Sequence, residues 1–245
     1  MDYSRYKFTV IEAVGYFAAF TGIAGIIAFF FYRSIIAFGI MFLFIPVYFK
    51  IVRKERKEAV KKKLADEFSE TLLCVSANMM AGYSPENAFC ESYKDIVMFY
   101  GDKSLMAGEI LWIKKGLSVN RTLEDLISEL SERSDIDDIR NFAEVFSAAK
   151  RNGGNLKDAL SDTAGTVREK LRVEKEIDVI ISEKLFELRV MEVVPFLILI
   201  YIGSTSKGYF DVLYNNVTGV LIMSAGLLVY AASIVLGRKI IKIEV

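Results

Sequence analysis

The stretch IIAFGIMFLFIPVYFKIVRKERKEAVKKK, residues 35–63, changes from an uncharged apolar run to a dense basic run within a few positions. Similar uncharged runs lie at 13–31, 193–206 and 217–237, so the chain carries two apolar pairs, one near each end. A helix needs about 20 apolar residues to cross the hydrocarbon core of a bilayer. The sequence therefore predicts four membrane-spanning helices, the second over 35–49.

Basic residues predict which side of the membrane the middle of the chain faces. Residues 50–63 hold eight Lys or Arg against two Glu, a surplus of six in a chain of zero formal net charge. Smaller basic flanks precede the first span and follow the last: Arg5, Lys7, Arg238, Lys239 and Lys242. Because flanks rich in Lys and Arg stay cytoplasmic, we predict a multi-pass protein of the plasma (inner) membrane. Both termini and the middle of the chain would be cytoplasmic, with a turn near Arg33 and a loop at 207–216 outside.

This topology divides the chain into three parts. Residues 1–52 form an N-terminal transmembrane hairpin, 53–191 a cytosolic helical bundle, and 192–245 a C-terminal transmembrane hairpin. The roughly 140 residues between the hairpins are enough for one compact domain. Cys74 and Cys90 lack metal-type spacing and are expected in the core, and the chain has no histidine. We expect no metal and no cofactor.

The middle of the chain has the apolar spacing of helices throughout. One stripe recurs every three or four residues, at Leu64, Phe68, Leu72, Val75 and Met79. Further stripes run through Phe89, Tyr93, Val97 and Tyr100; Ile110, Ile113 and Leu117; Leu126, Ile127 and Leu130; and Ile136, Ile139, Ala143 and Phe146. No window alternates with period two. The predicted fold class is all-α, an antiparallel helical bundle.

Helix boundaries are marked by residues that cap or stop helices. Gly82 and Gly101 are natural terminators, and Ser84 with Pro85 is a strong helix start. Ser104 and Thr122 are further predicted N-caps.

A long helix is predicted to lead from the bundle into the third span. Residues 156–194 keep a helical stripe without proline, which at about 1.5 Å per residue gives a rod of roughly 58 Å. Pro195 stands where a kink is expected. A continuous helix would couple the bundle to the membrane. The alternative is two helices with a break near Gly165.

A weak internal repeat relates residues 75–89 to 146–160, offset by 71 positions. Both copies contain a helix, a glycine stop, a polar cap and a second helix. The matching positions are Gly82, Ser84 and Ala88 in the first copy, and Gly153, Asn155 and Ala159 in the second. Glycine permits the left-handed conformation that ends a helix, and alanine lets helices pack closely. Two related helical hairpins are therefore expected.

The order of these features resembles a known family. A basic run is followed by AGYS (81–84) with Ala88, GGNL (153–156) with Ala159, VREKLR (167–172) and an apolar segment that contains Pro195. This order resembles the type II secretion system F-domain family, especially the single-domain platform proteins of tight-adherence (Flp-type) pili. The resemblance covers about residues 64–237. Two-domain relatives carry a second copy of the bundle, which this chain lacks.

The resemblance implies a non-enzymatic inner-membrane platform protein of a type IV (Flp/Tad-like) pilus or type II secretion machine. Such a platform couples a cytosolic motor ATPase to the extraction and assembly of prepilin, and it works as a homo-oligomer or with a second platform subunit. Whether the system builds a pilus, secretes protein or takes up DNA stays open.

Candidate contact residues lie in two charged clusters. They are Arg53, Lys54, Arg56, Lys57, Lys61, Lys62 and Lys63 in the basic run, and Asp135, Asp137 and Asp138 in an acidic cluster. Each cluster is also what a solvated helix face looks like. The basic run could instead bind anionic membrane lipid, at about 1 kcal/mol per cation, and it fits lipid better than nucleic acid.

The main alternative function is a small solute or proton transporter, and a membrane-anchored sensor is a third possibility. A transporter favours polar groups within the spans and inverted repeats in the membrane part, whereas the repeat here lies in the middle of the chain. Glu192, at the edge of the third span, is the ionisable residue that could serve intramembrane function or only reach the interface.

Overall fold

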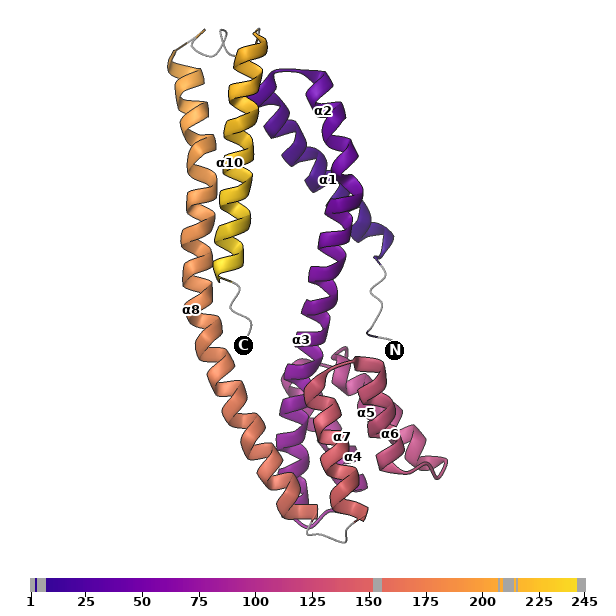
Figure 1. Ribbon diagram of the computed structural model, residues 1–245. Helices are drawn as coiled ribbons and strands as arrows, with labels where there is room; N and C mark the ends of the chain where they lie inside the picture. The colour runs from indigo at the N-terminus through magenta and orange to yellow at the C-terminus, as the bar shows by residue number, and fades with distance from the viewer. Residues whose placement is uncertain are drawn as a thin grey trace. The chain divides into compact units, whose positions relative to one another are not determined.

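The computed structural model describes residues 3, 8–151, 156–206, 208, 214 and 216–241, with the backbone alone for 156–161 (Figure 1). The chain forms two compact units. The bundle unit comprises Met1–Lys7 and Val52–Glu174, and the apolar unit comprises Phe8–Ile51 and Lys175–Val245. The regular elements of the described residues are all helices, which confirms the all-α prediction.

The apolar unit begins with a helical hairpin. Helix α1 (Val10–Ile27) continues into the π-helical turn η1 (Ala28–Tyr32), and α2 (Ile35–Met41) follows. Arg33 makes the turn in the left-handed region with φ 44°, and Ser34 caps α2 by accepting a hydrogen bond from the Ile36 amide. The predicted turn near Arg33 is therefore confirmed.

Aromatic rings hold the two arms of this hairpin together. The ring centroids of Phe17 and Phe42 are 6.2 Å apart, and those of Phe20 and Tyr48 are 5.2 Å apart. The Phe17–Phe42 pair is edge-to-face, an arrangement that adds stabilisation beyond the area that the rings bury.

The second arm of the hairpin contains a 3₁₀ turn, which the proline at position 46 explains. A 3₁₀ turn, η2 (Phe42–Phe44), separates α2 from α3 (Ile45–Met80). Pro46 lies next to this junction, has no amide hydrogen and cannot donate to the Phe42 carbonyl four residues earlier. The Ile45 amide bonds that carbonyl instead, in the shorter 3₁₀ pattern.

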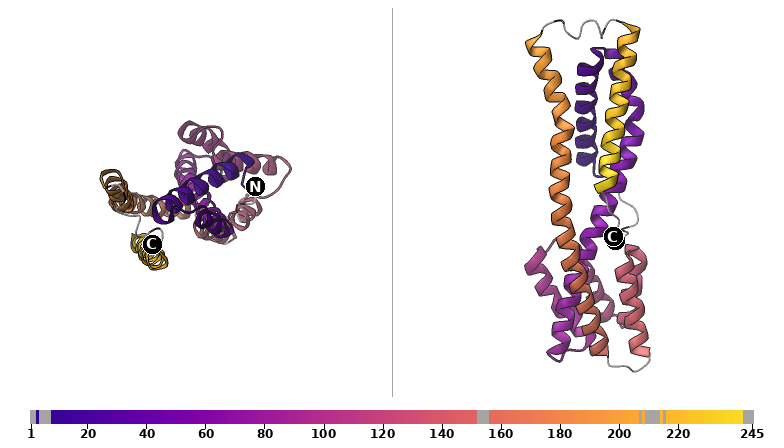
Figure 2. Two further views of the ribbon diagram at one scale, coloured as in Figure 1. Left: turned by 90° about the horizontal axis from the view of Figure 1, so that it is seen from above. Right: turned by 60° about the vertical axis from the view of Figure 1, so that its left-hand side comes forward.

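The apolar unit also contains an antiparallel pair, the part of α8 (Leu156–Thr205) from Lys175 onward and α10 (Val217–Ile241), which lie side by side in Figures 1 and 2. The rings of Phe196 and Tyr230 are 5.7 Å apart. Gly237 lets the helices approach, because a Cβ atom there would lie 2.7 Å from Leu188 Cδ1. Small residues of this kind are typical of packed membrane helices.

Three helices of the described part are long and apolar enough to cross a membrane: Val10–Tyr32, Ile35–Met80 and Val217–Ile241. They match the first, second and fourth predicted spans. Large apolar side chains point outward on them, including Ile35 (86% exposed) and Val229 (72%). Such exposure fits hydrocarbon better than water. The predicted span at 193–206 is the C-terminal end of α8 and is not one of the three.

The bundle unit packs four short helices around the C-terminal part of α3. They are α4 (Pro85–Tyr100), α5 (Leu105–Ser118), α6 (Leu123–Ser134) and α7 (Asp137–Arg151) (Figure 1).

The predicted helix boundaries of this unit are confirmed. The hydroxyls of Ser84, Ser104 and Thr122 each accept a hydrogen bond from the amide three residues later. Gly82 and Gly101 have φ of 100° and 83°, which suits glycine at a helix stop. Between α6 and α7 the left-handed residue is Asp135, with φ 52°.

The predicted stripes form the core of the bundle unit. Leu64, Phe68, Leu72, Val75 and Met79 of α3 are all buried. The buried residues of the other helices include Phe89, Ile110, Ile113, Leu126, Ile127, Leu130, Ile139 and Phe146, as expected. One predicted core residue is wrong, since Tyr100 is 43% exposed and Ile96 of the same helix is buried instead.

Helix α8 runs without interruption for 50 residues. It passes through Gly165, so the alternative of two helices with a break there is wrong. As predicted, the long helix continues past 194 into the following apolar segment, and Pro195 lies in its interior.

Only the first copy of the internal repeat, 75–89, lies entirely on residues whose side chains are described. In that copy, Gly82 ends α3, Ser84 caps α4, and Ala88 is fully buried. The Asn78 side-chain amide donates a 3.5 Å hydrogen bond to the Ala88 carbonyl across the hairpin. Gly153 and Asn155, and the side chain of Ala159, lie outside what the structure describes.

Candidate functional site

The basic run lies on α3, immediately after the apolar part of that helix. Arg53, Lys54, Arg56, Lys62 and Lys63 are exposed, and Lys57 and Lys61 are half-buried. Within the helix, Lys54 lies 3.8 Å from Glu58, one turn further on. The run is therefore helical and accessible to solvent over most of its length.

Lys61 connects the basic run to the acidic cluster. Its Nζ lies 2.6 Å from Asp135 Oδ2 and donates a second bond of 2.7 Å to the Asp135 carbonyl oxygen. The hydrogen bond from Lys61 lowers the pKa of Asp135 below its ordinary value. This double contact ties α3 to the turn between α6 and α7.

The other acidic residues also have internal partners. Arg140 lies 3.1 Å from Asp137 and 3.5 Å from Asp135. Lys170 of α8 lies 2.7 Å from both carboxylate oxygens of Asp138. The acidic cluster thus forms neighbouring ion pairs with Lys61 of the basic run, with Arg140 and with Lys170, and this group is named here the charged face. It is defined by Lys61, Asp135, Asp137, Asp138, Arg140 and Lys170.

A polar groove of about 630 Å³ lies between α6 and α7 of the same unit. Its acidic lining residues are Glu124, Asp125, Glu132 and Glu144, and its basic ones are Arg140 and Arg151. Glu124 is paired with Lys150 at 2.7 Å. The groove is open to solvent and offers further charge beside the charged face.

A buried polar network that sequence reasoning missed joins α5 to α6. Arg133 binds Glu109 through two hydrogen bonds of 3.0 and 2.6 Å, and Tyr3 donates to Glu109 at 2.7 Å. The Arg133 guanidinium also lies 4.9 Å from the ring centroid of Trp112. Burial alone would raise the pKa of Glu109, but the bonds from Arg133 and Tyr3 outweigh it and hold that pKa below its ordinary value.

Glu67 is a second buried carboxylate, with a capping role. It is fully buried in α3, and its Oε2 accepts a 2.8 Å hydrogen bond from the Met106 amide at the start of α5. A negative charge at a helix N-terminus is favourable and satisfies a backbone donor. No local spacing indicates this contact, because the partners are 39 residues apart.

Glu192 has a structural partner in the apolar unit. Arg238 of α10 binds both of its carboxylate oxygens at 3.1 Å, and the Tyr230 hydroxyl donates to its backbone carbonyl. These contacts pin α10 against α8. The charge of Glu192 is therefore compensated by the basic flank of the last helix.

Among the described residues, no group of three or more His, Cys, Asp or Glu side chains could hold a metal ion. The described carboxylates with short contacts serve ion pairs and helix caps. The charged face and the α6–α7 groove give the bundle unit a charged and polar surface.

No family model, no curated protein and no solved structure matches this chain.

Proposed function

We propose that this chain is a non-enzymatic membrane platform of the type II secretion F-domain kind, in a type IV (Flp/Tad-like) pilus or a type II secretion machine. In this role the bundle unit receives force from a cytosolic motor ATPase, and the apolar unit transmits it to prepilin in the bilayer. The proposal is supported by the order of motifs in the sequence together with one structural observation. Two uninterrupted helices, α3 and α8, each begin in one unit and end in the other.

The contacts of Tyr3 support a cytoplasmic N-terminus. Tyr3 precedes the first apolar helix, yet it bonds Glu109 through its hydroxyl and Arg133 through its backbone amide. Residues in contact lie on one side of a membrane, so the chain between Tyr3 and Glu109 crosses it an even number of times. The helices Val10–Tyr32 and Ile35–Met80 supply two crossings.

The end of α8, the third span predicted from the sequence, is proposed to cross the membrane as well. Val193, Leu197, Ile198 and Tyr201 are more than half exposed there, as lipid-facing residues would be. Since α10 returns antiparallel along α8, Arg238 comes back to the level of Glu192. Both hairpins then begin and end on the cytoplasmic side, and the basic run of α3 stands beside anionic lipid headgroups.

Uninterrupted helices suit force transmission, because an α-helix cannot shorten without breaking its backbone hydrogen bonds. Movement of the bundle unit would therefore displace the spans rather than be absorbed in a flexible linker. No step of this role requires covalent chemistry by the chain itself.

The decisive experiment is site-specific photo-crosslinking in the cells that carry the gene. A photoreactive residue replaces Glu132 or Glu144, which line the α6–α7 groove, or Lys54 on α3 as a second surface. The expected adduct contains a hexameric secretion-type ATPase, and deletion of the gene abolishes filament assembly or secretion. An intact, inserted protein that yields no ATPase adduct from any of these positions contradicts the proposal.

The transporter alternative is tested with the purified chain. Purified chain in sealed proteoliposomes is expected to show no solute or proton flux above that of empty vesicles. Flux that disappears on mutation of Glu192 would favour the transporter.

A further inference from the structure

Helix α8 carries an exposed apolar stripe that runs from its charged part into its apolar end. Large apolar residues recur every three or four positions, at Phe186, Val190, Val193, Leu197 and Tyr201. Their exposed fractions lie between 48% for Val190 and 70% for Tyr201. At 3.6 residues per turn, these five side chains fall on one side of the helix. This side is named here the α8 stripe.

A different side of α8 is covered by α10. Leu188 packs so close to Gly237 that a Cβ atom there would lie 2.7 Å from Leu188 Cδ1, and Glu192 is bonded to Arg238. Leu188 follows Phe186 by two residues, which places it about 200° further around the helix. The α8 stripe is therefore turned away from α10.

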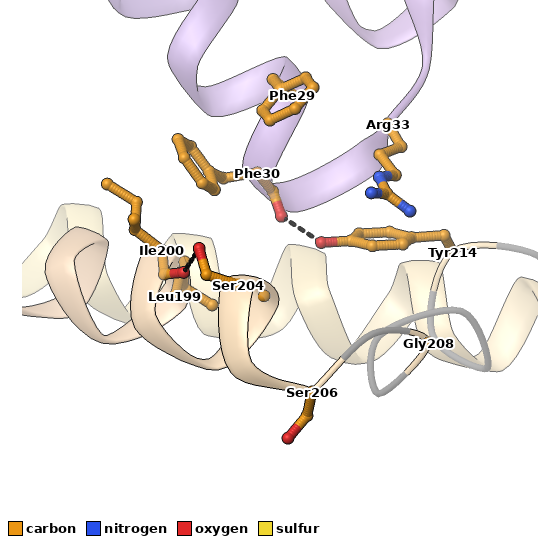
Figure 3. A pocket seen from close by; sticks show the side chains of 10 residues that line it. Phe29, Phe30, Arg33, Leu199, Ile200, Ser204, Ser206, Gly208 and Tyr214 are labelled. Atoms are coloured by element: carbon orange, nitrogen blue, oxygen red, sulfur yellow. Dashed lines mark hydrogen bonds between the residues drawn. The ribbon is translucent and has the colours of Figure 1, made fainter.

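The C-terminal end of α8 also faces the first hairpin. There, Leu199 and Ile200 line a cavity of about 350 Å³, and Phe29 and Phe30 of η1 lie across it (Figure 3). The next residue, Tyr201, is exposed and continues the stripe. The stripe thus passes the first hairpin without being covered by it.

The stripe begins in a part of α8 that does not suit hydrocarbon. Residues 183–192 contain five charged side chains, and the uncharged run 193–206 has 14 residues, whereas a span needs about 20. A helix that crosses the bilayer here brings Arg189 to the edge of the hydrocarbon, where a charge requires a partner. Lipid can cover the stripe after Val193, but an apolar stripe that continues among charges indicates a protein partner.

The two edges of the stripe carry opposite charge. At about 100° per residue, Arg189 lies on one edge, and Glu183 and Glu187 lie on the other. All three side chains are exposed. Copies inserted in the same orientation are related by a two-fold axis along the membrane normal, so their α8 helices run parallel. This symmetry sets the basic edge of one stripe against the acidic edge of the other, and such flanking charges select the partner of a helix.

We propose that the α8 stripe binds the α8 stripe of a second copy of this chain as a parallel pair. Phe186 and Val190 pack against their equivalents, and Arg189 of each copy pairs with Glu183 or Glu187 of the other. The inference rests on the proposed crossing of the membrane by the end of α8. It depends on neither a motor ATPase nor prepilin.

The experiment is disulfide crosslinking of the full chain in isolated membranes. In a Cys74→Ser, Cys90→Ser background, Val190→Cys is expected to form a covalent dimer on mild oxidation. Met191→Cys is the matched control, because Met191 lies at the same depth and is more exposed, 71% against 48%, but points about 100° further around the helix. Random collision favours dimers of Met191→Cys, whereas pairing through the stripe favours dimers of Val190→Cys.

Charge reversal tests the edges of the stripe. Arg189→Glu makes both edges acidic, and the double variant Glu183→Arg, Glu187→Arg makes both edges basic. In dilute proteoliposomes, each change is expected to lower the yield of the Val190→Cys dimer about tenfold, because charge-assisted contacts are replaced by repulsion. Differently tagged copies of the two variants, mixed in one membrane, are expected to crosslink to each other as well as unaltered copies do. Such recovery also shows that both variants are folded.

Three results contradict the proposal. They are equal or greater dimer yield from Met191→Cys, no dimer from either position in inserted protein, and crosslinking of Val190→Cys to a different membrane protein alone. The second result would leave the stripe to lipid, and the third would assign it to a second platform subunit. Insertion is checked by carbonate extraction of the same membranes. Extractable protein contradicts the proposed membrane function itself, whereas the three results above leave the test for a motor ATPase unaffected.

Discussion

Lys61 reaches across the bundle unit to Asp135 and binds both its carboxylate, at 2.6 Å, and its backbone carbonyl, at 2.7 Å. The two residues are 74 positions apart and come from the two clusters that the sequence marks as separate contact surfaces. Much of the acidic cluster is therefore occupied within the molecule. The surface offered to the proposed motor is therefore a set of paired charges rather than an isolated acidic patch.

The Lys61–Asp135 contact is predicted to hold the α6–α7 turn against α3. Lys61→Glu should speed hydrogen exchange of the amides at 135–140, because it places a second negative charge beside Asp135. The double variant Lys61→Glu, Asp135→Lys should restore slow exchange by reversing the pair. Exchange of the full chain in detergent, followed by mass spectrometry, checks both. Equal exchange in all three proteins would show that the contact does not restrain the turn.

The Glu109–Arg133 pair is predicted to make stability depend on acid. Arg133→Met removes the guanidinium partner of the buried Glu109 carboxylate and should lower the free energy of unfolding by about 3 kcal/mol. The folded pKa of Glu109 is depressed, so the pair contributes fully above the carboxyl's ordinary pKa of about 4.3 and is lost as pH falls through the lower folded value.

Denaturant unfolding of the full chain at several pH values measures this dependence. In a plot of the free energy of unfolding against pH, Glu109→Gln should reduce the slope below about pH 4.3. The double variant Glu109→Gln, Arg133→Met serves as control, since it removes both charges. If Glu109→Gln loses stability at acid pH as steeply as the unaltered chain does, other carboxylates govern acid unfolding.

Helical periodicity and capping residues were sufficient to predict most of the bundle. The α3 stripe, the three serine and threonine caps and the glycine stops are all local patterns of a few residues, so they can be read without knowing what packs against them. The prediction that Tyr100 is buried was wrong because it, too, used only a local pattern. Its spacing fits the α4 stripe, but the helix ends at Gly101, and which residue of the last turn is buried depends on its neighbours.

The polar contacts could not be predicted in this way. Tyr3 and Glu109 are separated by 106 residues, and Arg133 and Glu109 by 24. Partners so far apart in the sequence are not brought together by the repeat of a helix or a strand. Only the packing of the helices places these side chains in contact. The one available signal was the presence of Glu67 and Glu109 at apolar-stripe positions, where a buried carboxylate requires a partner.

Close packing between α5 and α6 is predicted to require glycine at position 116. A Cβ atom there would lie 2.9 Å from Leu126 Cδ1, and since Leu126 is fully buried, any shift of its side chain would disturb the core around it. Gly116→Ala should cost about 1–3 kcal/mol by overpacking. Gly108→Ala, in the same helix with open space around its Cβ position, should instead stabilise by about 0.5–1 kcal/mol. Thermal unfolding of the two variants measures the contrast, and equal effects would contradict it.

Cys74 is predicted to be a slow-reacting thiol. Burial, with Asp95 and Glu70 nearby, raises its pKa to about 11, so little thiolate is present at neutral pH. In a Cys90→Ser protein, maleimide labelling should rise about tenfold for each pH unit towards 11. The chain unfolded in denaturant should label faster at each pH. A plateau near pH 9 in the folded chain would show that the thiol is not perturbed.

The long helix α8 is predicted to be required for coupling but not for insertion. Val179 is 72% exposed, so its replacement removes little packing. Val179→Pro breaks one backbone hydrogen bond and costs about 3 kcal/mol within the helix. It should abolish filament assembly or secretion while the protein still reaches the membrane and still crosslinks to the ATPase. Val179→Ala is the matched control and should retain function, because it keeps the helix intact. If the proline variant assembled filaments normally, α8 would not transmit force, and α3 alone would have to carry the motion to the spans.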